Sequence, residues 1–181
     1  APESGSERML KVIKKKIKIP RMLKSLKEAK KAGLVTRVNI IIGHPQEERS
    51  DTRKSLWLLV KCALVGCHDT AVMIFAPYPG SVYTQNLIDQ GKVSVGKDYY
   101  YIALVRSGWS SRTYNHVMGT KELLIKQYFM LCVFYAVAYI THPWRILDVF
   151  RSLFTGNEQT LLDQLLRTKL HRVRFIRKAP P

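Results

Sequence analysis

The sequence predicts an α/β fold built on parallel strands. Two apolar stretches rich in β-branched residues, Val35 to Ile42 and Thr70 to Phe75, have the length and composition of buried strands. A helical stretch from Ser50 to Gly66 separates them, and strands that alternate with helices pair in parallel through right-handed crossovers. Both an α/β barrel and an open doubly wound sheet satisfy this order.

The chain opens on a loop that runs directly into a helix. Ser6 suits the N-cap position, and the apolar Met9 and Leu10 follow where they can share one buried face. No strand precedes this loop in the sequence. We therefore expect the chain to begin within a fold, at the end of a strand that lies upstream.

The stretch from Ser6 to Ala32 is predicted to form two helices. Proline cannot continue a helix from within, so the break is expected near Lys18 to Pro20. Gly33 stands where a C-terminal helix cap is expected. The strand that follows, Val35 to Ile42, is apolar almost throughout, which predicts that both of its faces are covered.

The regular alternation of strands and helices stops after residue 90. Residues 91–119 are rich in Tyr, Ser and Gly and predict an irregular connector. Residues 120–181 predict a helical C-terminal extension with helices over Lys121 to Ile140, from Pro143 onward, and over Leu161 to Phe175. The sequence thus divides into an α/β part (residues 1–90), a connector and a helical extension.

The composition indicates a folded protein with anionic partners. The chain has 181 residues, of which 46% are hydrophobic, enough for one domain with a core. Lys and Arg number 30 against 13 Asp and Glu, giving a formal charge of +17. This charge favours nucleic acid, phosphate-bearing ligands or acidic lipid headgroups, without choosing among them.

The cysteine spacing indicates a reduced, cytoplasmic compartment. Cys62, Cys67 and Cys132 form neither a CxxC pair nor an even-numbered secreted framework. The longest nearly uncharged run, Tyr128 to Thr141, is shorter than the roughly 20 residues of a membrane span, which favours a buried or interfacial helix. Trp144, beside an apolar helix, suits equally a peripheral membrane contact and a helix docked on the α/β part.

Four segments of the chain, in their order, carry a resemblance to one family. They are Glu3 to Lys15, Asn39 to Glu47, Phe75 to Ser81 and His142 to Arg145. Together they resemble the C-terminal part of a radical S-adenosylmethionine (SAM) enzyme of the cobalamin-binding type, similar to the anaerobic magnesium-protoporphyrin monomethyl ester cyclase family. The first three segments carry most of the likeness, and the fourth indicates only a subgroup.

The resemblance implies the second half of a partial (β/α)6 TIM-like radical SAM barrel, followed by the helical extension. The chain would start at the end of the fourth strand and include the fifth and sixth. In the full-length family the cofactors are SAM and a [4Fe-4S] cluster, with cobalamin in this type, and the partner is a small-molecule substrate. The substrate and reaction stay open.

The resemblance also implies which residues hold SAM. Glu3 and Ser4 match the place where the family holds the ribose, and Lys15 looks like the basic position that meets the methionyl carboxylate. Asn39 is similar to a second ribose contact, and Ile41 to the apolar contact beneath adenine. The remaining predicted contacts are made by backbone: Gly43, where a glycine lets the chain approach a ligand closely, and Ala76, at the adenine-reading strand edge.

The chain departs from the family in one respect that decides activity. Radical SAM chemistry needs three thiolates, spaced CxxxCxxC, to hold the cluster. No such motif is present, so the cluster ligands are not in this chain, no catalytic or metal-ligating residue is assigned, and we expect the chain to be inactive by itself.

The sequence also allows an alternative function for the chain, and it offers one histidine in a candidate loop. The chain could instead be a basic, non-catalytic module that binds RNA or an acidic membrane surface. The sequence has no RNP signature, zinc knuckle or GXXG loop, so nucleic acid is the less favoured partner. His44 follows a strand but precedes a proline, and we interpret it as a loop residue rather than an acid or base.

Overall fold

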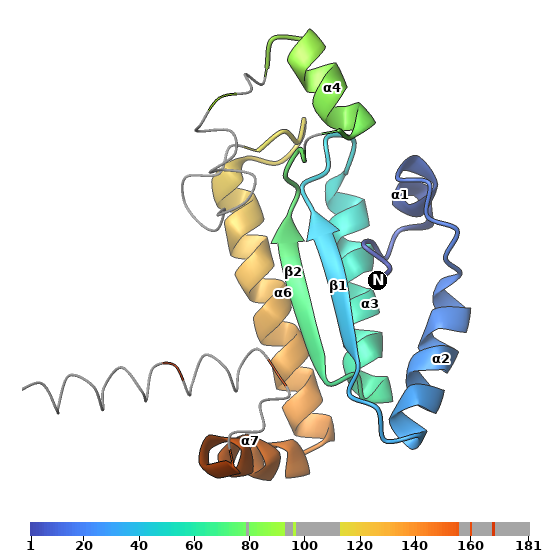
Figure 1. Cartoon of the computed structure of the whole chain (residues 1–181), viewed down its shortest axis with the longest axis vertical. Helices are drawn as coiled ribbons and strands as arrows, with labels where there is room; N and C mark the ends of the chain where they lie inside the picture. The colour runs from blue at the N-terminus through green and yellow to red at the C-terminus, as the bar shows by residue number, and fades with distance from the viewer. Residues whose placement is uncertain (79, 93–95, 97–112, 156–159, 161–167, 169–181) are drawn as a thin grey trace, which may run out of the picture.

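A two-stranded parallel sheet forms the centre of the molecule (Figure 1). The computed structural model describes residues 1–78, 80–92, 96, 113–155, 160 and 168. Strand β1 (Arg37–Ile42) pairs with β2 (Asp69–Ile74) along their whole length, with Arg37 opposite Asp69 and Ile42 opposite Ile74. The predicted α/β arrangement with parallel strands is therefore present.

The N-terminal loop pairs with the other edge of β1. Glu3 forms an isolated parallel bridge to Ile40. Its backbone N–H donates to the Asn39 carbonyl at 3.2 Å, and its carbonyl accepts from Ile41 N–H at 2.8 Å. The order across the sheet is thus the Glu3 segment, β1 and β2. Whether this sheet is the second half of a (β/α)6 barrel stays a prediction.

Helices cover one face of this sheet. Helix α3 (Arg49–Val65) packs on β1, α6 (Thr120–Thr141) packs on β2 and on α3, and α2 (Ile19–Lys31) packs on α3. In Figure 1, α3 lies behind β1 and α6 runs alongside β2. The core between them buries apolar side chains from both strands and both long helices, among them Val38, Ile40, Leu59 and Phe134.

The burial of β1 corrects one expectation. The apolar run predicted a strand covered on both faces, but burial alternates along it, with Val38, Ile40 and Ile42 buried and Asn39 and Ile41 only partly so. Described helices pack on one face alone. The other face, which carries Asn39 and Ile41, borders the cavity described below.

The first helix ends earlier than predicted. Helix α1 (Glu7–Val12) is capped by the Ser6 side chain and stops before Lys14, whose φ of 55° is left-handed. Pro20 does not break a helix but opens α2, where its missing N–H has no helical partner to lose. The chain is therefore divided into two helices as predicted, but the break between them is the turn after α1 and not Pro20.

The second half of the described chain contains three helices. Helix α4 (Val82–Asp89) follows the loop after β2, and α6 confirms the helix predicted over Lys121 to Ile140. Helix α7 (Trp144–Thr155) begins where predicted, with Leu147 70% exposed. Most of the predicted connector and the predicted helix over Leu161 to Phe175 lie outside the described residues.

Among the described helices, α6 is long and apolar enough to cross a membrane, as judged by length and composition alone. It also packs on β2 and α3 and buries Leu123, Met130 and Phe134. Part of the apolar surface of α6 is therefore buried in the core of the protein.

Candidate functional site

A cavity of about 310 Å³ lies where the Glu3 segment and the C-terminal ends of β1 and β2 meet. Four residues that the sequence singled out line it: Glu3, Ser4, Lys15 and Ile41. The remaining walls come from Met9 and Ile13 of the first helix and its turn, from His44 and Glu47 after β1, and from Phe75 and Tyr83 after β2. Three segments far apart in the sequence thus share one site.

Glu3 and Lys15 supply the charged groups of this cavity. Lys15 Nζ donates to Glu3 Oε1 at 3.2 Å. The Glu3 side chain is only 20% exposed. Glu3 also has a positive φ of 65°, a conformation that costs a non-glycine residue about 1 kcal/mol or more and is found more often at functional sites. A carboxylate and an ammonium therefore face one ligand-sized space.

Ser4 is buried and contributes mainly to the loop itself. Its Oγ lies 3.3 Å from Ser55 Oγ and accepts from the Ser6 N–H at 3.1 Å. The neighbouring Gly5 donates its N–H to Ser55 Oγ at 3.0 Å. These bonds fix the loop on α3, and they already engage the hydroxyl that the resemblance assigned to the ribose.

Asn39 and Ile41 share the face of β1 that borders the cavity. Asn39 Oδ1 is buried and has no hydrogen-bond partner among the described residues. Leaving a buried amide oxygen unpaired costs roughly 1 to 3 kcal/mol, so a polar ligand group would relieve that cost. Ala76 follows Phe75, whose N–H donates to the Ile42 carbonyl at 2.7 Å.

Gly43 is required for a different reason from the one expected. Its φ of +82° is left-handed, which confirms the sharp turn. A Cβ added at Gly43 would lie 2.7 Å from Leu123 Cδ1 of α6. The close approach that this glycine allows is therefore to α6, and it positions the end of β1 against that helix.

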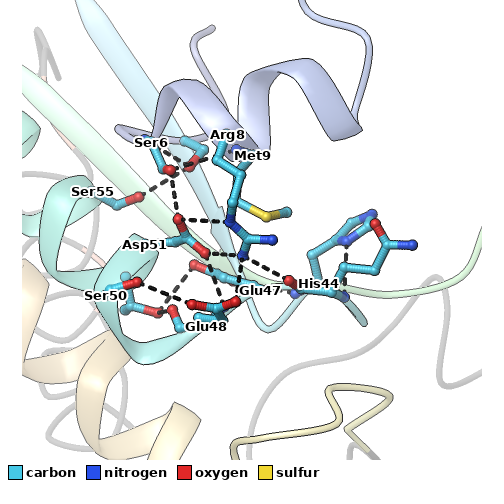
Figure 2. A network of polar contacts seen from close by, with 12 residues as sticks. Ser6, Arg8, Met9, His44, Glu47, Glu48, Ser50, Asp51 and Ser55 are labelled. Atoms are coloured by element: carbon cyan, nitrogen blue, oxygen red, sulfur yellow. Dashed lines mark hydrogen bonds and ion pairs between the residues drawn. The ribbon is translucent and has the colours of Figure 1, made fainter.

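A buried carboxylate ties the N-terminal loop to the start of α3 (Figure 2). Asp51 Oδ1 accepts from Ser6 Oγ at 2.6 Å, and Asp51 Oδ2 is ion-paired with the guanidinium of Arg8 and accepts from Glu48 N–H at 3.0 Å. Arg8 also donates to the Gln46 carbonyl at 2.9 Å. Burial opposes ionisation of Asp51, but these donors outweigh it and hold its pKa below the usual value.

His44 and Glu47 are site residues that the sequence interpretation did not include. Burial lowers the pKa of His44 to about 4 and raises that of Glu47 to about 7. Both belong to the loop that the sequence had singled out after β1. No pattern in the sequence tells which side chains of that loop turn inward, so their direction appears only in three dimensions.

The cysteines do not fit a [4Fe-4S] cluster. Cys62 and Cys67 are buried, and burial raises the pKa of both thiols, that of Cys62 to about 12, whereas Cys132 is exposed on α6. Within the described residues no group of three or more His, Cys, Asp or Glu side chains could hold a metal ion.

Chemically, the cavity joins an acceptor carboxylate, a cation and apolar walls, whereas the predicted contacts Asn39, Gly43 and Ala76 are not among its lining residues. These groups suit a flat ligand with hydroxyl groups and a charged tail. No family model matches this chain, and no curated protein matches it. The assignment of a function therefore depends on the geometry of the cavity.

Proposed function

We propose that this chain contributes the SAM-binding side of a radical SAM enzyme and binds the ribose, adenine and methionyl parts of that cofactor in the 310 Å³ cavity. The supporting observation is that Glu3, Ser4 and Lys15 of the first resembling segment, Ile41 of the second and Phe75 of the third line one cavity. Because the sequence contains no CxxxCxxC motif, we expect the chain to be inactive by itself.

Each group in the cavity has a role toward the cofactor. The Glu3 carboxylate accepts hydrogen bonds from ribose hydroxyls, and the amide of Asn39, which lies outside the cavity lining on the same face of β1 as Ile41, supplies a second polar contact. Lys15, now 3.2 Å from Glu3, binds the methionyl carboxylate as a point charge. Ile41 packs under the adenine. SAM itself supplies the radical chemistry of this class of enzyme.

Titration calorimetry of the whole chain with SAM tests this function. We expect saturable binding that weakens roughly tenfold or more in Glu3→Gln, because a lost hydrogen bond to a charged group costs about 1.5 to 3 kcal/mol. Asn39→Ala is expected to weaken binding several-fold. Glu28→Gln is the matched control, since Glu28 pairs with Lys31 at 3.1 Å on the exposed face of α2.

Two outcomes contradict the proposal. One is an absence of saturable SAM binding by the wild-type chain. The other is binding to which Glu3→Gln and Glu28→Gln respond alike, because the response would then reflect net charge and not this cavity.

A second candidate function is peripheral contact with an acidic membrane, and we propose it on one observation. The face of α6 turned away from the core is apolar and exposed, with Ile125 70%, Tyr128 57%, Phe129 56% and Ile140 79% accessible. Together with a net charge of +17, such a face suits an interface with anionic lipid. Sedimentation with lipid vesicles tests it.

A further inference from the structure

His44 is held rigidly at the wall of the cavity. Its ring lies edge-on to two aromatic rings, with centroids 5.0 Å from Phe75 and 4.4 Å from Tyr83. The side chain is buried, with 5% of its surface exposed. Edge-on contacts of this kind fix the plane of an imidazole, so the direction of its free nitrogen is fixed as well.

The two nitrogens of the His44 ring differ in their hydrogen bonding. Nδ1 accepts from the Gln46 N–H at 3.4 Å, so in the neutral ring the proton sits on Nε2. His44 Nε2 is buried and has no hydrogen-bond partner in the part of the chain that the structure describes. A buried donor without an acceptor is costly, and here it borders a ligand-sized space.

The neighbouring groups do not satisfy this donor. Both carboxyl oxygens of Glu47 are engaged, since Oε2 accepts from the N–H groups of Gly43 and His44 and Oε1 accepts from Thr52 Oγ1. Glu3 is paired with Lys15.

We propose that His44 is a substrate-binding residue: its Nε2–H donates a hydrogen bond to an oxygen acceptor of a second ligand, whose flat apolar part packs against Phe75 and Tyr83. The ligand class is thus a planar or aromatic compound that carries a carbonyl or similar acceptor oxygen. This inference rests on the proposed function, because it places the second ligand beside the nucleoside cofactor in the same cavity.

Two small probes separate the hydrogen bond from the apolar contact. Acetophenone joins a flat ring to a neutral carbonyl acceptor, and toluene is a similar ring without it. We expect the whole chain to bind acetophenone roughly 3- to 10-fold more tightly than toluene, the range of one neutral hydrogen bond. In long-range ¹H–¹⁵N spectra, only acetophenone should shift the Nε2 signal of His44.

Three variants test whether the preference for acetophenone depends on the His44 imidazole and whether Tyr83 contributes the apolar contact. His44→Phe keeps a flat side chain but removes the donor, so both probes should then bind equally. Tyr83→Leu should weaken both probes. His116→Phe is the control, because His116 is exposed and should leave the preference for acetophenone intact.

Several results would overturn the proposal: equal affinity of the two probes for the wild-type chain, a preference that survives in His44→Phe, or a loss of SAM affinity in that variant, which would assign His44 to the cofactor. If His44→Phe fails to fold, the wild-type Nε2 shift decides alone, and its absence overturns the proposal. If SAM does not bind but the preference for acetophenone persists, the proposed function is wrong and the assignment of His44 stands.

Discussion

Glu47 closes the loop after β1 through both carboxyl oxygens. Oε2 accepts from the backbone of Gly43 and His44, and Oε1 accepts from Thr52 Oγ1 at 3.1 Å. Burial outweighs these donors and raises the pKa of Glu47 to about 7. The folded protein therefore keeps a proton on this group at pH values where the unfolded chain, with the ordinary value near 4.5, has released it.

The contribution of Glu47 to the stability of the protein should consequently fall as the pH rises. A raised carboxyl pKa contributes stability that is fully present below about 4.5 and is lost as the pH passes through about 7. Each pKa unit corresponds to about 1.4 kcal/mol, so the loss is on the order of 3 kcal/mol. Glu47→Gln, which cannot ionise, lacks this loss, so its free energy of unfolding in urea should rise relative to that of the wild type between pH 4.5 and 7.5.

Asp51 provides an internal comparison in the same experiment. Its pKa is lowered, so its contribution is lost as the pH falls below the ordinary carboxyl range and not in the window assigned to Glu47. A wild-type profile and a Glu47→Gln profile that run parallel from pH 4.5 to 7.5 would contradict the assignment to Glu47.

At the scale of elements, the N-terminal loop is fixed to α3 by contacts that leave no spare room. Gly5 packs so closely that a Cβ added to it would lie 2.4 Å from the Lys54 carbonyl oxygen and 2.7 Å from Ser55 Cα. Both are backbone atoms, which cannot rotate away. The Asp51 contacts to Ser6 and Arg8 hold the same loop a few residues further on.

Gly5→Ala should therefore push this loop off α3. We expect a loss of about 1 to 3 kcal/mol in the free energy of unfolding, measured in urea, because overpacking against backbone forces a shift. SAM affinity should fall with it, since Glu3 lies two residues away. Gly119→Ala is the matched control: its φ of −76° is ordinary and its Cβ would meet no atom within 4 Å.

If the two alanine variants lose equal stability, the close contact between Gly5 and α3 is not decisive. A normal SAM affinity in a destabilised Gly5→Ala would likewise separate the loop from the cofactor site.

At the scale of the whole molecule, α6 has two different faces. One face packs on β2 and α3, and the other exposes Ile125, Tyr128, Phe129 and Ile140. At the start of helix α7, Trp144 is 54% exposed. Arg145 turns inward, where its guanidinium donates to the Gly66 and Cys67 carbonyls at 2.7 and 2.8 Å, and so fixes the start of α7 on the α/β part.

The proposed membrane contact predicts that this outer face binds vesicles. The chain should sediment with vesicles of phosphatidylglycerol and phosphatidylcholine more than with phosphatidylcholine alone. Ile125→Ser with Ile140→Ser should weaken binding roughly tenfold, because both side chains lose apolar area without a change in charge.

The control for vesicle binding is Leu34→Ser with Val35→Ser. These residues are 57% and 51% exposed in the loop between α2 and β1, and they do not belong to α6. Equal sedimentation of the two double variants would count against the proposed membrane contact, since apolar exposure in general would then explain the binding.

The sequence by itself determined both strands, the end of α3 and most of the charged site. β-Branched runs placed both strands to within two residues, and Gly66, with its φ of 93°, ended α3 as expected, because these signals depend on local sterics. It also singled out Glu3, Lys15 and Ile41, which share one cavity, since strand ends in a parallel sheet meet at one edge.

Only the tertiary structure decided which face of each element turns toward that cavity. It showed that Gly43 faces Leu123, that His44 and Glu47 turn inward, and that Tyr83 of α4 closes a wall. These outcomes depend on contacts between segments far apart in the chain. Local sequence patterns record backbone preference and hydrophobic periodicity, but the direction of a loop side chain follows from the packing around it.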